Sequence, residues 1–454
     1  MRQFISWIQF VAARRSFLFP LAMLAVLLCG RVAHADVQAG GIDKADTCWM
    51  LVSAAFVLLM TPALGFFYAG MTRQKNALNT LLLSFSAAAV VGVAWVLAGY
   101  SLAFGDGNWF IGDLRYLGLA GVGLDAPTIA GNHLTIPHQA FMIYQCMFAI
   151  ITPALISGSI VERMKFSTFM VFMFFWSLLV YCPVAHWVWG GGWLGHLGAM
   201  DFAGGTVVHV NAGFSALVAC IMVGPRQDYR VQPMRPHNLP FTLLGAGLLW
   251  FGWFGFNAGS ALSSGELSTA AFVTTNTATA AAMLTWMLLD QFTRKEVTAL
   301  GAATGAVAGL VGITPAAGFV SPMGALCLGA IVSGICYCSA NWRAKSRLDD
   351  SLDAFAVHGV GGFSGAILTG VFATAALKKY NPGAMAGLLE GNAHAVLVQI
   401  VAAVSSAVYA MAVTFVILKV LHATMGLRVN EETEERGLDI CLHGEEAYGE
   451  SAAY

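Results

Sequence analysis

Long apolar runs alternate along the chain with short stretches rich in Gly, Pro and charged residues. An α-helix needs about 20 apolar residues to cross a hydrocarbon layer about 30 Å thick. The pattern therefore predicts an all-α polytopic membrane protein. Its eleven transmembrane helices are expected near residues 46–70, 78–104, 138–160, 167–188, 201–223, 240–262, 268–290, 298–313, 319–340, 354–376 and 393–421.

The composition excludes a soluble domain. Of the 454 residues, 58% are hydrophobic and 10% are charged, whereas soluble proteins carry about 25% charged residues. The formal net charge is −1, and no basic face indicates nucleic-acid binding. The outer surface of the helices is expected to face membrane lipid.

Residues 1–35 have the pattern of a signal peptide. Two arginines precede an apolar run at 17–28, and Ala-His-Ala at 33–35 matches a cleavage site. The mature chain is expected to begin outside the cytoplasm, with a transmembrane domain over 36–425 and a cytoplasmic tail over 426–454.

Basic residues gather in alternate loops, and such loops face the cytoplasm by the positive-inside rule. The mature N-terminus is then outside and the C-terminus inside. The basic loops contain Arg73 and Lys75, Arg163 and Lys165, Arg226, Arg230 and Arg235, Arg294 and Lys295, and Arg343, Lys345 and Arg347.

Two segments of the chain resemble each other. VHVNAGFS at 208–215 matches VHGVGGFS at 357–364 in five positions, and Asp201 and Asp350 each lie eight residues before the histidine. By the predicted topology the two copies enter the membrane from opposite faces. This indicates an inverted repeat of five helices (46–223), five more (240–376) and one additional helix (393–421).

The matching histidines, His209 and His358, are candidate functional residues. Eight helical residues span roughly 12 Å, about half of the hydrocarbon core, which would place both imidazoles near the midplane. A neutral pair offers hydrogen bonds to a small polar solute and can pass a proton. Axial ligation of haem is the alternative, although no CxxCH motif supports it.

Aromatic residues gather at a few places: Tyr144 and Phe148 on the third predicted helix, Trp189 at the outer end of the fourth, and Trp253 and Phe256 on the sixth. Each could serve only in packing or in a membrane belt. Together with a central polar pair they suggest a vestibule in which ring faces hold a small cation.

The acidic residues near the histidines have a structural interpretation as well. Asp201 is a good helix N-cap by residue type, and its charge would also favour a cation nearby. Asp350 and Asp353, beside Arg347, indicate capping and an ion pair at the inner face.

The mature chain resembles ammonium transporters of the Amt/Mep/Rh superfamily, and the prokaryotic Amt branch fits best. The resemblance rests on DFAGGTVVHVNAG (201–213), WFGWFGFNAGSAL (250–262), VWGGGWLG (188–195), GITPAAGFV (312–320), VHGVGGFSG (357–365) and GLRVNEETEERGLDICLHGEEAYG (426–449).

The resemblance implies roles for individual residues. His209 and His358 match the twin histidines of the pore, and Phe256 matches the inner member of a ring gate. Tyr144 stands at the outer member's position, where the family often has Phe. Phe148, Trp189 and Ser260 match the ammonium recruitment site, and Asp201, Trp253, Asn257, Thr314 and Asp353 are expected to have structural or electrostatic roles.

The resemblance further implies a homotrimer in the bacterial inner membrane, no cofactor, no enzymatic activity, and a tail that meets a neighbouring subunit and a P-II regulatory protein. Ammonium would lose its proton outside and cross as ammonia, with separate proton transfer. A neutral ammonia channel and an ammonium sensor remain alternatives. An ATP-driven pump is disfavoured because the sequence contains no P-loop pattern.

Overall fold

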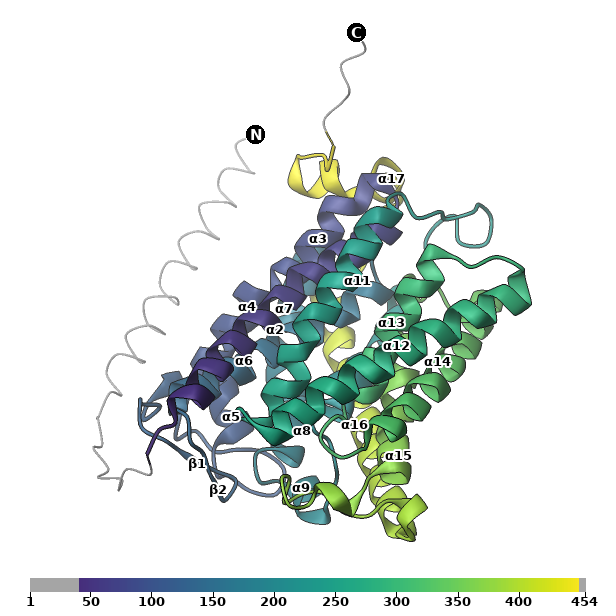
Figure 1. Cartoon of the computed structure of the whole chain (residues 1–454). Helices are drawn as coiled ribbons and strands as arrows, with labels where there is room; N and C mark the ends of the chain where they lie inside the picture. Colours follow the sequence, from purple (N-terminus) through teal and green to yellow (C-terminus); the bar gives the residue numbers. More distant parts are fainter. Residues whose placement is uncertain (1–40, 449–454) are drawn as a thin grey trace, which may run out of the picture.

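The computed structural model describes residues 41–448, so the expected signal peptide lies outside the described residues. In this part of the chain, nine helices are long and apolar enough to cross a membrane. The 29-residue α12 and the shorter apolar α13 are consistent with the expected eleven. The all-α polytopic fold is confirmed, and Figure 1 shows the helices running between two ends of one bundle.

The first half of the bundle precedes residue 224. Its helices and strands are α2 (Lys44–Met71), α3 (Ala77–Phe85), α4 (Ala87–Ala94), α5 (Tyr100–Phe104), β1 (Thr128–Ile129), β2 (Asn132–His133), α6 (His138–Ile156), α7 (Phe166–Trp176), α8 (Cys182–Val188), α9 (Trp193–Leu197) and α10 (Asn211–Val223).

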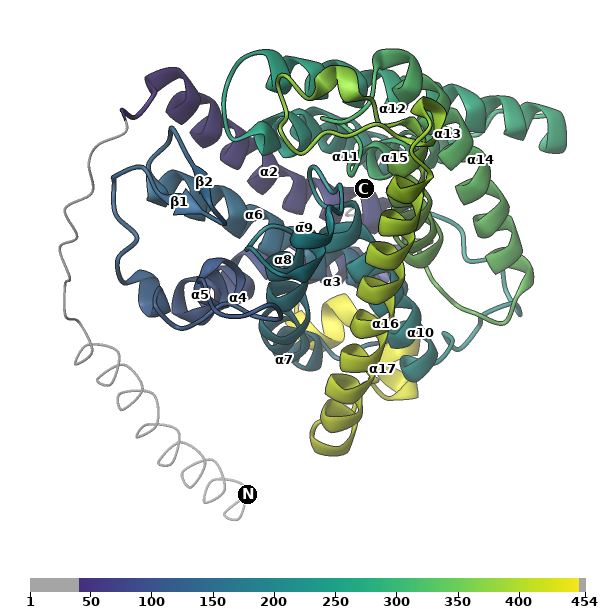
Figure 2. The same cartoon turned by 90° about the horizontal axis from the view of Figure 1, so that it is seen from below.

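The second half begins with a helix that packs along α2. Its helices are α11 (Leu239–Trp253), α12 (Glu266–Arg294), α13 (Ala299–Ile313), α14 (Pro322–Lys345), α15 (Val360–Phe372), α16 (Ala393–Thr424) and the short α17 (Glu431–Arg436). Figure 2 shows the long α16 running down the view next to α15 and α10, both of which it contacts.

Three π-helical turns hold candidate residues; two of them begin a helix and one follows the end of α11. They span Gly205–Val210, Phe254–Ala258 and Phe355–Gly359, and they hold His209, Phe256 and His358. A π turn contains one residue more than an α-helical path and is frequent at functional sites. The helix predicted from residue 201 starts only at Gly205, because residues 201–204 are not helical.

The two matching halves meet where the helix over Gly205–Val223 crosses the helix over Phe355–Phe372, at the π turn that begins each. A Cβ atom at Gly213 would collide with the backbone of Gly359, and one at Gly362 would lie 2.7 Å from Cβ of His209. Only glycine allows this close approach. The crossing brings the two histidine-bearing segments into direct contact.

The tail after α16 docks on the first turn of α3 and on the loop after α10, at the end opposite the β1–β2 hairpin (Figure 1). The Asp439 carboxylate accepts hydrogen bonds from the backbone N–H groups of Leu78 (2.9 Å) and Asn79 (2.7 Å). Glu434 is buried, pairs with Arg428 at 2.6 Å and accepts from the Gln227 N–H. These residues are therefore anchored and not simply solvated.

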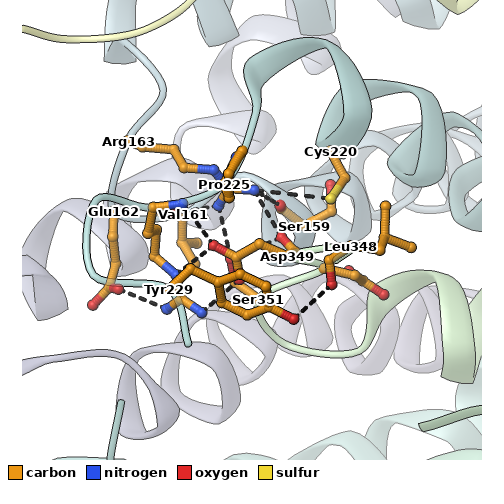
Figure 3. A network of polar contacts seen from close by, with 12 residues as sticks. Ser159, Val161, Glu162, Arg163, Cys220, Pro225, Tyr229, Leu348, Asp349 and Ser351 are labelled. Atoms are coloured by element: carbon orange, nitrogen blue, oxygen red, sulfur yellow. Dashed lines mark hydrogen bonds and ion pairs between the residues drawn. The ribbon is translucent and has the colours of Figure 1, made fainter. Parts of the chain in front are cut away.

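A buried ion network joins three loops at the same end of the bundle. Arg226 contacts Glu162 at 2.7 Å and Asp349 at 2.8 Å. Burial alone would raise the pKa of both carboxyls, but the neighbouring arginines outweigh it and lower both pKa values. Figure 3 shows the adjacent Arg163, which donates to the carbonyl oxygens of Ser159 and Asp349 at 2.8 Å each.

Candidate functional site

The two predicted histidines lie side by side in the interior, with their rings nearly parallel and their Nδ1 edges facing each other. Nδ1 of His209 is 3.3 Å from Nδ1 of His358, and the rings are 5.4 Å apart and inclined by 17°. One ring must donate and the other accept, so this contact requires at least one neutral imidazole. It also leaves no space for a haem plane between them.

Trp253 and Thr314 hold His209 in place. The indole of Trp253 lies parallel to the His209 ring at 5.4 Å, with 17° between the planes. Its Nε1–H donates to Oγ1 of Thr314 at 2.8 Å. This bond fixes the indole, which in turn limits rotation of the imidazole.

A narrow space of about 10 Å³ adjoins the histidine pair. Its lining consists of the two histidines, two aromatic rings and aliphatic side chains, with no charged group: Met60, Leu64, Ile151, Leu155, Val208, His209, Leu249, Trp253, Phe256, Val307 and His358. Nε2 of His209 is buried and has no hydrogen-bond partner among the described residues. This atom is therefore available to a small solute.

Phe256 is stacked against Phe148, with ring centroids 4.3 Å apart and planes inclined by 38°. Both rings are almost fully buried. Tyr144 lies beside Phe148 at 4.9 Å, and its hydroxyl donates to the carbonyl oxygen of Phe256 at 2.8 Å. The ring over Phe256 is thus Phe148, not Tyr144 as the resemblance implied.

A larger cavity of about 460 Å³ lies on the other side of these rings, next to the β1–β2 hairpin. We call it the outer cavity because the orientation predicted from the sequence places this end outside. Phe148, Trp189 and Ser260, the three residues expected at a recruitment site, all line it. The rings of Phe148 and Trp189 meet edge to face at 6.1 Å and 85°. Gln145 lines the same cavity and was not singled out from the sequence, although its spacing to Phe148 places both on one helix face.

Asp201 caps the helix that carries His209. Its carboxylate accepts from four backbone N–H groups, those of residues 204 to 207, at 2.6–3.1 Å, and from the Thr206 hydroxyl. The backbone carbonyl of Asp201 also accepts from Trp189 Nε1 at 2.9 Å. The carboxylate is fully engaged, which favours the capping interpretation over direct contact with a solute.

Asp350 caps the matching helix in the second half. It accepts from the N–H groups of Ala354 and Phe355, at 3.1 and 2.8 Å. Burial and then the nearby Asp353 carboxylate raise the pKa of Asp350 to about 7. The expected pairing with Arg347 is wrong, because Asp353 binds Arg343 at 2.7 Å, on the last turn of α14.

Asn257 connects the π turn of Phe256 to α12 by a hydrogen bond. Its Nδ2 donates to Oγ1 of Thr275 on α12 at 2.9 Å. The side chain is fully buried and does not line either cavity. The contact supports the structural role expected for this residue.

Comparison with known proteins shows the family of the chain. Residues 48–448 match the family described as "Ammonium Transporter Family". The chain belongs to the ammonium transporter family. This transporter is 48% identical over 411 residues to the ammonium transporter of Bacillus subtilis, covering 90% of this chain and 100% of that protein.

Solved structures agree with this assignment. The transporter resembles the crystal structure of Saccharomyces cerevisiae Mep2 with a TM-score of 0.83 and 36% identity, covering 91% of this chain and 94% of that one. A structure titled "Sensor Amt Protein" matches with a TM-score of 0.80 and 29% identity, over 88% of this chain and 98% of that one. The sequence resemblance is confirmed, and the protein is a multi-pass ammonium transporter.

Proposed function

We propose that this transporter binds ammonium at the outer aromatic cavity, that the bound ion passes one proton to a relay that includes His209 and His358, and that ammonia then crosses past the same pair. One observation carries the proposal. The stacked rings of Phe148 and Phe256 lie between a wide outer cavity and a narrow, uncharged, histidine-lined space.

The outer cavity suits a small cation. The faces of Phe148 and Trp189 can attract a cation by about 0.5–2 kcal/mol. The space beyond the rings offers no carboxylate, so an unpaired charge there would cost at least several kcal/mol. Ammonia avoids this cost and can exchange hydrogen bonds with His209 and His358.

The paired rings act as the gate in this mechanism. Phe148 and Phe256 must rotate apart for a molecule to pass, because their centroids are only 4.3 Å apart. The hydroxyl of Tyr144 holds the Phe256 backbone, so we assign Tyr144 to positioning of the gate. Asp201 fixes the helix of His209 and contributes a negative field near the cation site.

The path continues toward the tail side of the molecule. A cavity of about 320 Å³ there is lined by Leu352, Asp353 and Val357, next to His358, and by Arg226 and Arg343. Its opening among charged residues would allow ammonia to become protonated again. The arrangement supports passage through the subunit itself.

The setting of the transporter follows from the same proposal. We place it in the bacterial inner membrane, with the mature N-terminus outside and the docked tail in the cytoplasm, as a homotrimer with one path per subunit. The tail would present the site for a P-II regulatory protein. Apolar side chains exposed on the helices, among them Phe85, Val93 and Phe175, would face lipid.

Ammonium pulses on proteoliposomes test the mechanism, with current recorded on a solid-supported membrane and potassium as the control ion. The wild type should give an ammonium current and no potassium current. His209→Ala and His358→Ala should abolish the current or let potassium through, whereas His394→Ala, at an exposed position on α16, should behave as wild type. Wild-type selectivity and flux in both pore variants would refute the role of the pair.

A further inference from the structure

Gln145 is an unexplained polar residue in the wall of the outer cavity. It lies on α6 between Phe141 and Phe148, and all three residues line this cavity. Positions 141, 145 and 148 fall on one helix face because they are spaced by four and three residues. The helix thus presents one amide between two aromatic rings.

The amide of Gln145 is buried without a visible purpose in the fold. The residue is 7% exposed, and its Oε1 has no hydrogen-bond partner among residues 41–448. Buried side-chain amides in proteins are nearly always hydrogen-bonded, and exceptions call for an explanation. A ligand that donates hydrogen bonds would provide one.

The polar groups of Ser260 and Trp189, which line the same cavity, already have partners. Oγ of Ser260 donates to the Phe256 carbonyl at 2.9 Å and lies 3.2 Å from the Tyr144 hydroxyl. Nε1 of Trp189 donates to the Asp201 carbonyl at 2.9 Å. Ring faces attract a cation but accept no strong, directional hydrogen bond. Among the buried side chains that line this cavity in residues 41–448, only Gln145 therefore has an acceptor without a partner.

We propose that the side-chain oxygen of Gln145 accepts a hydrogen bond from ammonium in the outer cavity, given the recruitment role proposed above for that cavity. Ammonium carries four N–H donors, and the amide offers an acceptor with two lone pairs. Rotation of the terminal amide by half a turn exchanges its oxygen and nitrogen, so the oxygen can turn toward the bound cation.

A neutral amide suits this position better than a carboxylate. An amide stabilises the cation through its dipole but does not hold it by a full opposite charge. The cation can then still lose its proton and leave the cavity toward the histidines. Gln145 would contribute binding and orientation, without taking the proton itself.

Two substitutions on the same proteoliposome assay test the proposal. Gln145→Leu removes the acceptor at similar volume and should raise the half-saturating ammonium concentration about tenfold or more, as expected for loss of one hydrogen bond to a charged group. The maximal current should stay near wild type. Gln145→Glu keeps an acceptor and should give a half-saturating concentration at or below wild type.

Gln139→Leu is the matched control, because Gln139 is exposed on the first turn of α6 and does not line the cavity. An unchanged half-saturating concentration in Gln145→Leu, or an equal rise in Gln145→Leu and Gln145→Glu, would overturn the proposal. If only the Gln145 proposal is wrong, the wild type still gives an ammonium current. If the transport mechanism is wrong, the wild type itself gives no ammonium current, so the two failures can be told apart.

Discussion

Removal of Arg226 tests the buried ion network most directly. Its side chain is 6% exposed, and the side chains of Glu162 and Asp349 are fully buried. Arg226→Met would leave two buried carboxylates short of their shared cation. Loss of one partner from a buried ion pair costs about 3–5 kcal/mol. We expect this cost once, not twice, because a single arginine serves both carboxylates.

The pH dependence gives this prediction a sign. In the wild type the pKa values of Glu162 and Asp349 are lowered below their reference values of 4.5 and 3.8. Their stabilisation is therefore present above those values and is lost as the pH falls through the native pKa values. Without Arg226, burial raises the pKa values of Glu162 and Asp349 relative to the wild type. Acidification should then protonate both carboxylates and reduce the destabilisation of the variant.

Thermal unfolding of the purified protein in detergent, followed by tryptophan fluorescence, measures both effects. Arg226→Met should melt well below the wild type at pH 8, and the gap should narrow toward pH 5. The triple variant Arg226→Met, Glu162→Gln, Asp349→Asn should recover part of the loss, because neither buried carboxylate is left without Arg226. The recovery should be incomplete, since Arg73 loses its ion pair with Glu162 at 3.2 Å. Arg230→Met, at an exposed arginine of the same loop, is the control.

The reasoning is refuted if Arg226→Met and Arg230→Met melt alike at pH 8. It is also refuted if the gap to the wild type widens on acidification. Either result would mean that the two carboxylates do not depend on Arg226 for their charge.

Three further predictions concern residues around the path. Asp201→Ala should destabilise the transporter by about 2–4 kcal/mol in the same melting assay, because four backbone N–H groups lose their acceptor; a melting curve equal to the wild type would contradict this. Tyr144→Phe removes the hydroxyl bond to the Phe256 carbonyl and should cost only about 0.5–1.5 kcal/mol, with the ammonium current retained; loss of current would give the hydroxyl a direct role. Asp350 has a native pKa of about 7 against a reference of 3.8, so its contribution to stability should fall as the pH rises from about 4 to 7. Asp350→Asn should therefore show a smaller fall in melting temperature between pH 5 and pH 8 than the wild type. An equal fall in both would contradict the raised pKa of Asp350.

Much of the architecture could be read from the pattern of apolar residues. Membrane helices are easy to predict because a run of about 20 consecutive apolar residues is typical of a transmembrane helix and of few other elements. The pairing of His209 with His358 was also accessible, because two matching segments in opposite orientations place equivalent residues near one another. These predictions depended on periodicity and on repetition, which a sequence displays directly.

The pairing of individual side chains was less accessible. Tyr144 and Phe148 are four residues apart and share a helix face, so spacing could not decide which ring covers Phe256. Phe256 lies in the π turn at Phe254–Ala258, which changes the direction of its ring relative to an α-helix. No residue pattern in the sequence predicts this turn. Arg343 replaced Arg347 as the partner of Asp353 because α14 ends at Lys345, a boundary that hydropathy locates only within a few residues.

The π turns around His209 and His358 bear on the history of the protein. Each arises when one residue is inserted into an α-helix, and they occupy matching places in the two halves, Gly205–Val210 and Phe355–Gly359. An insertion that preceded the duplication of an ancestral five-helix unit accounts for both at once. A half-length ancestor would then already have carried its histidine on a π turn, and pairing two such units in opposite orientations would have created the central pair.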